Sequence, residues 1–151
     1  MMDFSSLNSM NISASGLTAQ RTVMDVIANN IANADTTRTP TGGPYRREIV
    51  ELAPIGTSGN FASALNQAMS SQSAPVGGGV QVVGIVQDGS PFPTQYDPTS
   101  PDAVNGYVQM PNVNISTEMV DMAAATQAYQ ANVTAFDSAK QMNVDALSLG
   151  K

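Results

Sequence analysis

The sequence predicts an α+β fold, in which two long terminal helices form an antiparallel coiled-coil-like pair and a small β-rich insertion lies between them. Apolar residues recur at helical spacing near both ends, whereas β-branched residues, glycines and prolines occupy the middle. We divide this single structural unit into an N-terminal helix (1–34), an insertion (35–110) and a C-terminal helix (111–151). Each helical stripe is narrow, and a long helix buries a narrow stripe only against another helix. The pattern therefore predicts a component of an assembly.

The N-terminal helix is expected to run from about Asn8 to Asn33. Its apolar stripe repeats every seven residues, at Met10, Leu17, Met24 and Ile31. Gly16 costs about 1 kcal/mol relative to alanine, so it is either a tolerated weak point or a place where another backbone approaches closely. Asparagine is a poor helix former, so the three asparagines near the end suggest amide hydrogen bonds across a contact, or fraying. They are Asn29, Asn30 and Asn33.

The insertion begins with a loop over residues 35–44, because threonine, glycine and proline dominate there. A short strand is expected at Tyr45–Leu52, and the clearest strand signal in the chain is Val80–Gln87. Prolines keep the chain extended around Thr94–Tyr96, and Gly106–Gln109 is a further short strand. Residues 53–79, between the strands expected at Tyr45–Leu52 and Val80–Gln87, are small, polar and rich in serine and glycine. We expect this segment to be mobile in isolation, with one short helical turn at Phe61–Met69.

The C-terminal helix is expected to begin near Asn114 or Ser116, either of which suits the N-cap position. Glu118 lies where a negative charge favours the positive end of the helix dipole. The helix is expected to reach about Leu149 and to stop at Gly150. Its apolar stripe follows alternating steps of three and four residues, at Met119, Met122, Thr126, Tyr129, Val133 and Phe136.

Composition argues against several classes of function. The net charge of −6 argues against nucleic acid as a partner, because phosphate binding requires clustered lysine and arginine. Cysteine and histidine are both absent, which removes the usual thiolate nucleophile, the commonest general base and the commonest zinc ligand. We expect no cofactor, no small-molecule ligand and no catalytic or metal site. The first residues lack the basic and apolar regions of a signal peptide, and no apolar run is long enough to insert into a membrane.

The only acidic residues in the sequence that we consider as a candidate catalytic or metal site are Asp97, Asp102, Glu118 and Asp121. Paired carboxylates can perform acid–base chemistry or bind Ca²⁺. Their spacing matches no EF-hand loop, and no strong base or nucleophile accompanies them. Turn and capping roles are therefore the favoured interpretation. An enzyme built on them would require all four to converge in one pocket.

The N-terminal segment also carries a recognisable motif. Ser15–Arg21 and Met24–Ala34 resemble the N-terminal motif of the flagellar rod, hook and related axial proteins. Similarity to the proximal rod members of that family lies in Thr37–Pro40, Gly42–Arg47, Tyr96–Pro98 with Pro101–Ala103, and Gly106–Val108 with Pro111–Asn114. The C-terminal pattern is matched by Glu118–Met119, Asp121–Met122, Tyr129–Val133, Ala139–Lys140 and Ala146–Leu147. The resemblance spans nearly the whole chain, although Gln127 stands where the family pattern has arginine.

This resemblance implies a non-enzymatic structural subunit of the bacterial flagellar proximal rod. Such a subunit would be exported by the flagellar type III apparatus without a cleaved signal peptide. It would polymerise in the periplasm, with itself and with the rod proteins FlgB, FlgF, FlgG and FliE, into a hollow shaft that carries torque from motor to hook. The terminal helices would form the inner wall. One alternative is another type III-secreted coiled-coil component of needle or translocon type, and a weaker one is a binding module formed by residues 35–110.

The predicted subunit interface combines the two stripes with polar residues beside them. The apolar part comprises Met10, Leu17, Met24, Ile31, Met119, Met122, Tyr129, Val133 and Phe136. The polar part comprises Asn29, Asn30, Asn33, Asn132, Tyr45, Arg46 and Arg47, of which Tyr45–Arg47 is implied by the resemblance alone. Because so much burial would depend on neighbouring subunits, we expect the helices to be poorly ordered in a lone chain.

Overall fold

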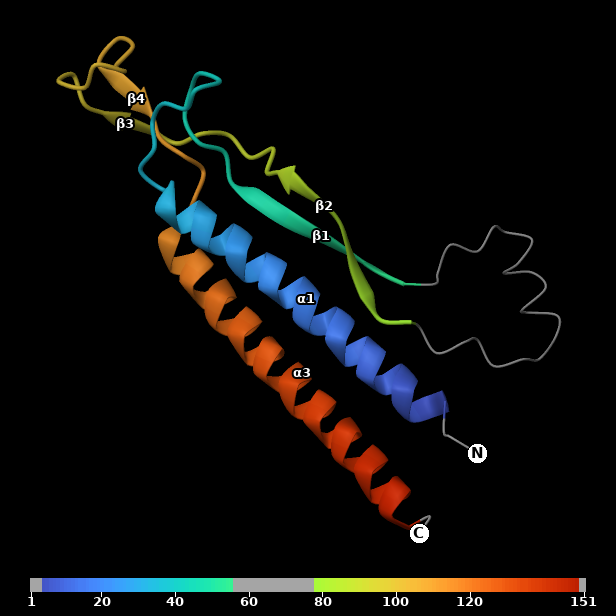
Figure 1. The fold of residues 1–151 in the computed structure, drawn as a ribbon. Coiled ribbons are helices and arrows are strands. Elements are labelled where there is room, and N and C mark those ends of the chain that lie inside the picture. The colour runs from blue at the N-terminus through green and yellow to red at the C-terminus, as the bar shows by residue number, and fades with distance from the viewer. Residues whose placement is uncertain (1–3, 56–77, 150–151) are drawn as a thin grey trace, which may run out of the picture.

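The structure is a computed structural model that describes residues 4–55 and 78–149. Within these residues, two helices and four strands follow in the order α1, β1, β2, β3, β4, α3 (Figure 1). The α+β class is confirmed, with the helices at the two ends of the chain and the strands between them. Most of the predicted mobile segment 53–79, including the turn predicted at 61–69, lies outside the described residues.

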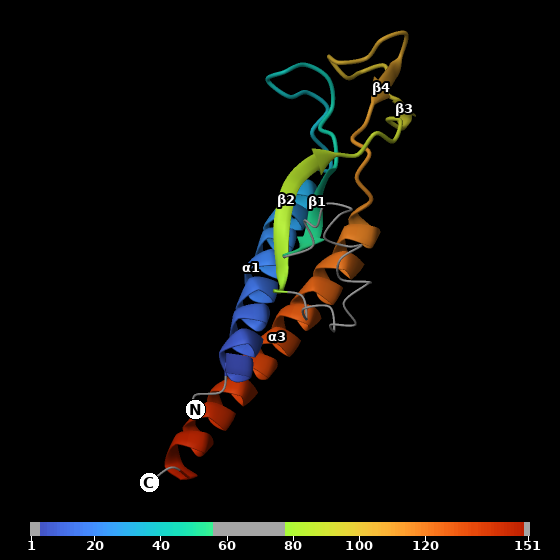
Figure 2. The same cartoon turned by 90° about the vertical axis from the view of Figure 1, so that its right-hand side faces the viewer.

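The helices α1 (Phe4–Ala32) and α3 (Ile115–Leu149) lie side by side and antiparallel, so that both chain ends lie at the same end of the molecule (Figures 1 and 2). At 1.5 Å per residue they are about 44 and 52 Å long. Of the two proposed caps for α3, Asn114 fills the position, because its Oδ1 accepts hydrogen bonds from the backbone N–H of Ser116 (3.0 Å) and Thr117 (3.3 Å).

The first two strands form a twisted two-stranded ribbon that runs along α1 (Figure 2). β1 (Glu48–Pro54) pairs antiparallel with β2 (Val80–Gln87), with an irregularity between Glu51 and Leu52. The sequence placed β2 at these bounds, whereas β1 begins later than the predicted Tyr45 because Tyr45 and Arg47 are turned toward the helices. Within the described residues the ribbon packs on α1, and neither of its strands packs on α3.

A second small sheet covers the far end of the molecule, away from the termini (Figure 1). β3 (Thr94–Tyr96) pairs antiparallel with β4 (Tyr107–Gln109), and the rings of Tyr96 and Tyr107 meet edge to face with centroids 5.2 Å apart. The connecting turn closes on Asn105 and Gly106, both at positive φ. In the part of the chain that is described, neither long helix has a stretch apolar enough to cross a membrane.

Candidate functional site

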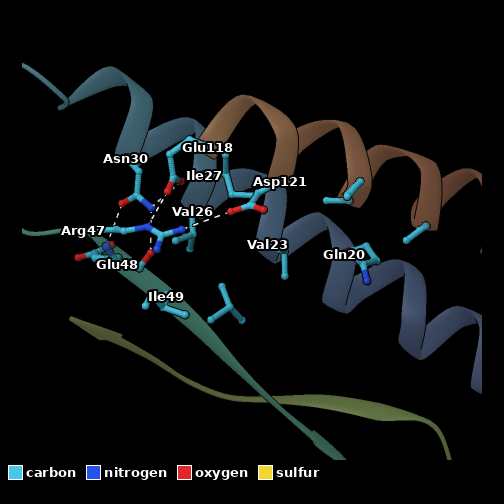
Figure 3. Close-up of a pocket in the computed structure, with 14 residues that line it drawn as sticks. Gln20, Val23, Val26, Ile27, Asn30, Arg47, Glu48, Ile49, Glu118 and Asp121 are labelled. Carbon is cyan, nitrogen blue, oxygen red and sulfur yellow. Dashed lines mark hydrogen bonds and ion pairs between the residues drawn. The ribbon is translucent and has the colours of Figure 1, made fainter. Parts of the chain in front are cut away.

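The helices and the ribbon are joined by a buried polar cluster that we call the junction clamp. It consists of Asn30 from the end of α1, Arg47 just before β1, and Glu118 from the first turn of α3 (Figure 3). These residues are far apart in the sequence, yet their side chains point toward one another. The clamp therefore ties three separate segments of the chain together at one place.

Asn30 forms the link between α1 and the ribbon, and only 1% of its surface is exposed. Its Nδ2 donates hydrogen bonds to the carbonyl oxygen of Glu48 (2.8 Å) and to Oε2 of Glu118 (3.1 Å). Its Oδ1 accepts from the backbone N–H of Glu48 (2.9 Å) and from the hydroxyl of Tyr45 (3.0 Å). Both amide hydrogens and both acceptor positions are thus used, which satisfies a buried amide completely.

Arg47 and Glu118 form the charged half of the clamp. Nε of Arg47 lies 2.6 Å from Oε1 of Glu118, whose residue is 0% exposed. The guanidinium also lies 3.3 Å from Asp121, whose side chain is 47% exposed, and 3.9 Å from Asp88. Removing one partner of a buried ion pair costs about 3–5 kcal/mol, because the remaining charge is left without compensation. The arrangement holds the first turn of α3 against the start of β1.

Tyr45 completes the polar shell around Asn30. Burial raises the pKa of the Tyr45 hydroxyl above its ordinary value, and the negative charges of Glu48 and Glu118 raise it further. The hydroxyl therefore stays protonated at neutral pH and remains a donor to Asn30. Asn29 also reaches the same hydroxyl, at a longer 3.4 Å.

Arg46 points away from the clamp, although the sequence groups it with Arg47. Its guanidinium donates to the carbonyl oxygens of Asp88 (2.8 Å) and Ser90 (3.3 Å) and lies 4.3 Å from the ring centre of Phe92. Hydrogen bonds from Ser90 are the main reason that the pKa of Asp88 is lowered, and the charges of Arg47 and Arg46 lower it further. Arg46 thus fixes the turn that follows β2.

The opposite end of the ribbon is attached to α1 through Ser15. The Ser15 hydroxyl donates to the carbonyl of Ile12 (2.7 Å) and accepts from the backbone N–H of Val80 (3.1 Å), at the start of β2. Gly79 has a φ of +110°, and a Cβ there would collide with the Ser15 side chain. The distance from Ser15 to Asn30 along α1 is about 22 Å, which matches the length of the ribbon at about 3.3 Å per residue. The ribbon is therefore fixed to α1 at both ends.

Small residues are among the most buried in the two helices: Ala19 of α1 and Ala125 and Ala139 of α3. Gly16 faces Asn132 of α3 so closely that a Cβ would lie 2.8 Å from Nδ2 of Asn132. Of the two readings of Gly16, the structure therefore favours close approach, with a side chain rather than a backbone as the neighbour. The absence of a side chain at Gly16 thus allows α1 to lie close to Asn132 of α3.

Several residues of the predicted stripes contact the opposite helix or are partly buried. Met10 and Met24 touch α3 through their sulfur atoms, at 3.3 Å from Nδ2 of Asn143 and 3.7 Å from Oγ1 of Thr126. On α3, Met119 is 62% exposed and Val133 is 36% exposed. The remaining predicted residues of the two stripes are half-buried, namely Leu17, Ile31, Met122, Tyr129 and Phe136. Asn33 bonds back to Asn29, at 3.0 Å.

The four acidic residues tested above do not converge in one pocket. Asp97 accepts two hydrogen bonds from Thr99 in the turn after β3, and these bonds lower its pKa. Asp102 bonds to Thr37 and lies 3.4 Å from Arg38. Only Glu118 and Asp121 lie together, and both face Arg47. No cluster of potential metal ligands occurs within residues 4–55 and 78–149.

Comparison with known proteins matches a flagellar basal-body rod family model at each end of the chain. Residues 10–38 match the family described as Flagella basal body rod protein, and residues 104–149 match Flagellar basal body rod FlgEFG protein C-terminal. The flagellar basal-body rod protein FlgC of Bacillus subtilis (strain 168) is 50% identical over 149 residues, covering 95% of this chain and 97% of that protein. The chain belongs to the FlgC family of flagellar basal-body rod proteins.

Further FlgC proteins show similar coverage. The FlgC of Borreliella burgdorferi is 44% identical over 147 residues, covering 94% of this chain and 95% of that protein. The FlgC of Salmonella typhimurium is 35% identical over 146 residues, with 96% and 98% covered. FlgC-family proteins are structural, non-enzymatic components of the flagellar rod. The junction clamp is accordingly a structural site of a FlgC-family chain, and no catalytic role is assigned to its carboxylates.

Proposed function

We propose that this chain is a subunit of the flagellar proximal rod, which polymerises into a hollow helical shaft that transmits torque from the motor to the hook. The observation that carries the proposal is a long uncharged stretch in each of the two helices. No charged residue occurs in α1 before Arg21, or in α3 between Met122 and Phe136. A helix that faces water normally carries charges on its outer face. These surfaces are therefore interpreted as subunit contacts.

The small buried core supports the same conclusion. Among the described residues, the buried apolar side chains are Ala19, Val26, Ile27, Ala34, Val108, Ala125 and Ala139. Most of these are alanines, which contribute little apolar area each. Meanwhile Val120 is 67% exposed and Met119 is 62% exposed on α3. Neighbouring subunits would supply the burial that one chain lacks, as expected for an open array of heterologous contacts.

The predicted interface divides into two groups once the internal contacts are known. Met119 and Val133 are available to a neighbour, and the half-buried Met10, Leu17, Met24, Ile31, Met122, Tyr129 and Phe136 would extend their contact along both helices. Asn30, Arg47 and Asn132 are used within the chain. Their proposed role is to hold the helices and the ribbon as one unit, so that torque received by the helices reaches the ribbon.

The partners follow from the rod itself. We propose contacts with further copies and with FlgB, FlgF, FlgG and FliE, export through the flagellar type III apparatus, and assembly in the periplasm. Nucleic acid, small molecules and insertion into the membrane have no part in this function. The proposed basal-body location agrees with the names of the relatives.

Complementation tests this function. A Bacillus subtilis strain lacking its own FlgC would receive the chain, and swimming and isolated basal bodies would be scored. The unmodified chain should restore both, and Val133→Asp should restore neither, because it places a charge in an apolar contact. Val133→Thr is the matched control, since it keeps the shape of valine without a charge. Normal swimming with Val133→Asp would contradict the proposed role of this surface, and failure of the unmodified chain would count against the rod function.

A further inference from the structure

An open groove runs beside the junction clamp, between α1, α3 and β1 (Figure 3). It exists because the ribbon packs on α1 and leaves the adjoining face of α3 uncovered. The groove has a volume of about 390 Å³. Its walls are apolar, with Val23 of α1 facing Ile49 of β1, and with the small residues Ala124 and Ala128 along α3. It is wide enough for the side chains of another helix.

The end of the groove nearest the clamp is acidic. Three carboxylates line it, those of Glu48, Glu118 and Asp121, against one guanidinium, that of Arg47. Glu118 is fully enclosed, whereas the side chain of Asp121 is 47% exposed and is open to a partner. The occupant that fits is a helix with a cation at one end of an apolar stripe.

The C-terminal part of α3 carries such a stripe, at Lys140, Val144 and Leu147. Steps of four and three residues place the three side chains on one face. Val144 is 51% exposed and Leu147 is 63% exposed. Within residues 4–55 and 78–149, no carboxylate lies within ion-pair distance of Lys140. The stripe therefore consists of two exposed apolar side chains and, at its N-terminal end, a lysine that has no ionic partner among those residues.

The register of the two surfaces agrees at every position. Moving nineteen residues along α3 takes Asp121 to Lys140, Ala125 to Val144, and Ala128 to Leu147. Two parallel copies staggered by about 28 Å would thus place the cation beside the carboxylate, and the two larger apolar side chains beside the alanines. The groove and the stripe also lie on opposite flanks of the helix seam, because each residue turns the helix by about 100°. The contact is consequently heterologous and can repeat without closing.

We propose that the groove of one copy receives the Lys140–Val144–Leu147 stripe of a second copy, with Lys140 paired to Asp121. This inference rests on the proposed rod function and specifies the contact between adjacent copies. The stagger between neighbours then follows from the chain itself, since Lys140 fits only the acidic end of the groove.

Cysteine cross-linking tests the contact directly, because the chain contains no cysteine of its own. The double variant Ala128→Cys/Leu147→Cys would be expressed, in place of the unmodified chain, in the Bacillus subtilis strain that lacks its own FlgC. Its basal bodies would be isolated and oxidised, and their proteins separated by gel electrophoresis without reductant. The two sites lie about 28 Å apart on one straight helix, too far for a disulfide within a chain. A ladder of linear oligomers is expected. The matched control is Val83→Cys/Leu147→Cys, because Val83 is 62% exposed and lies outside the groove.

The possible results separate the inference from the rod function. Swimming cells without cross-linked oligomers, or with the control cross-linked equally well, would overturn the inference and leave the rod function in place. A dimer formed by Leu147→Cys alone would also overturn it, since that result indicates a symmetric contact.

A charge exchange gives an independent readout. Lys140→Glu should reduce swimming at least tenfold, Lys140→Glu/Asp121→Lys should restore much of it, and Asp137→Asn, one turn away on the same face, should not reduce it. Absence of any restoration, with helicity unchanged, would contradict the proposed pair.

Discussion

Removing the positive charge of the junction clamp is expected to destabilise the whole junction. Arg47→Met keeps much of the apolar stem but removes the guanidinium, so Glu118, which is 0% exposed, keeps only the hydrogen bond from Asn30. Breaking a buried pair costs about 3–5 kcal/mol. The contact with the half-exposed Asp121 adds less than about 1 kcal/mol, and the 3.9 Å approach to Asp88 adds little. We expect a total loss of about 3–4 kcal/mol.

The partner variant distinguishes a buried charge from lost packing. In Arg47→Met/Glu118→Met no carboxylate is left uncompensated, and replacing a buried ion pair by apolar side chains is often nearly neutral. The double variant should therefore be more stable than Arg47→Met by about 2 kcal/mol or more. Arg46→Met is the matched control, because Arg46 lies outside the clamp, and it should cost about 1 kcal/mol.

The assay must work even if the lone chain is only marginally folded. Helicity at 222 nm would be followed by circular dichroism while urea and trimethylamine N-oxide are varied, since the osmolyte strengthens burial and urea weakens it. The shift of the midpoint between variants gives the difference in free energy of unfolding. Equal losses of stability in Arg47→Met and in the double variant would show that the cost does not come from an unpaired Glu118.

Three further predictions concern the seam, the ribbon and acid. Gly16→Ala should force Asn132 to move, so its effect on the free energy of unfolding, measured from urea curves, should become more favourable by about 0.5–1 kcal/mol when Asn132→Ala is also present; strict additivity of the two changes would contradict the close approach. Ser15→Ala should remove the acceptor for the N–H of Val80, cost about 1 kcal/mol, and speed hydrogen exchange at Val80 more than at Val86; equal protection in both proteins would argue against this attachment. The pKa values of Asp88 and Asp97 are lowered in the folded chain. Their contribution to the free energy of unfolding is therefore complete above the ordinary aspartate pKa of about 4 and is lost as pH falls through the folded values. Asp88→Asn should therefore make the free energy of unfolding depend less steeply on pH in the acid range. An unchanged dependence on pH would contradict the lowered pKa of Asp88.

The ends of the chain could be predicted from sequence because their signals are local. Helical spacing predicted both helices, and a run of β-branched residues placed Val80–Gln87 at its observed bounds. The most deeply buried positions of the helices were less accessible. The heptad of large residues that includes Leu17 predicted where the helices make contacts, whereas the most buried apolar side chains of the two helices include the alanines Ala19, Ala125 and Ala139. Alanine is common on all helix faces, so its pattern does not mark the buried side.

The clamp could not be assembled from sequence, although parts of it gave signals. The unusual asparagine run pointed to amide bonds across a contact, and Asn30 makes such bonds within its own chain. Glu118 was interpreted as a helix-dipole residue, because nothing local shows that a carboxylate in a first turn faces an arginine far away in the sequence. Ser15 and Gly79 were missed for the same reason, since only the folded ribbon brings them together.

A map of an intact basal body in which this chain is traced is the most direct test of the central claim, that the helix pair is buried by neighbouring subunits while the clamp holds the ribbon to it. In such a map the exposed side chains of Met119 and Val133 should lie against other rod subunits, and Asn30, Arg47 and Glu118 should remain in contact within the chain. A traced chain whose α1 and α3 face solvent, or whose ribbon has separated from the helices, would contradict it.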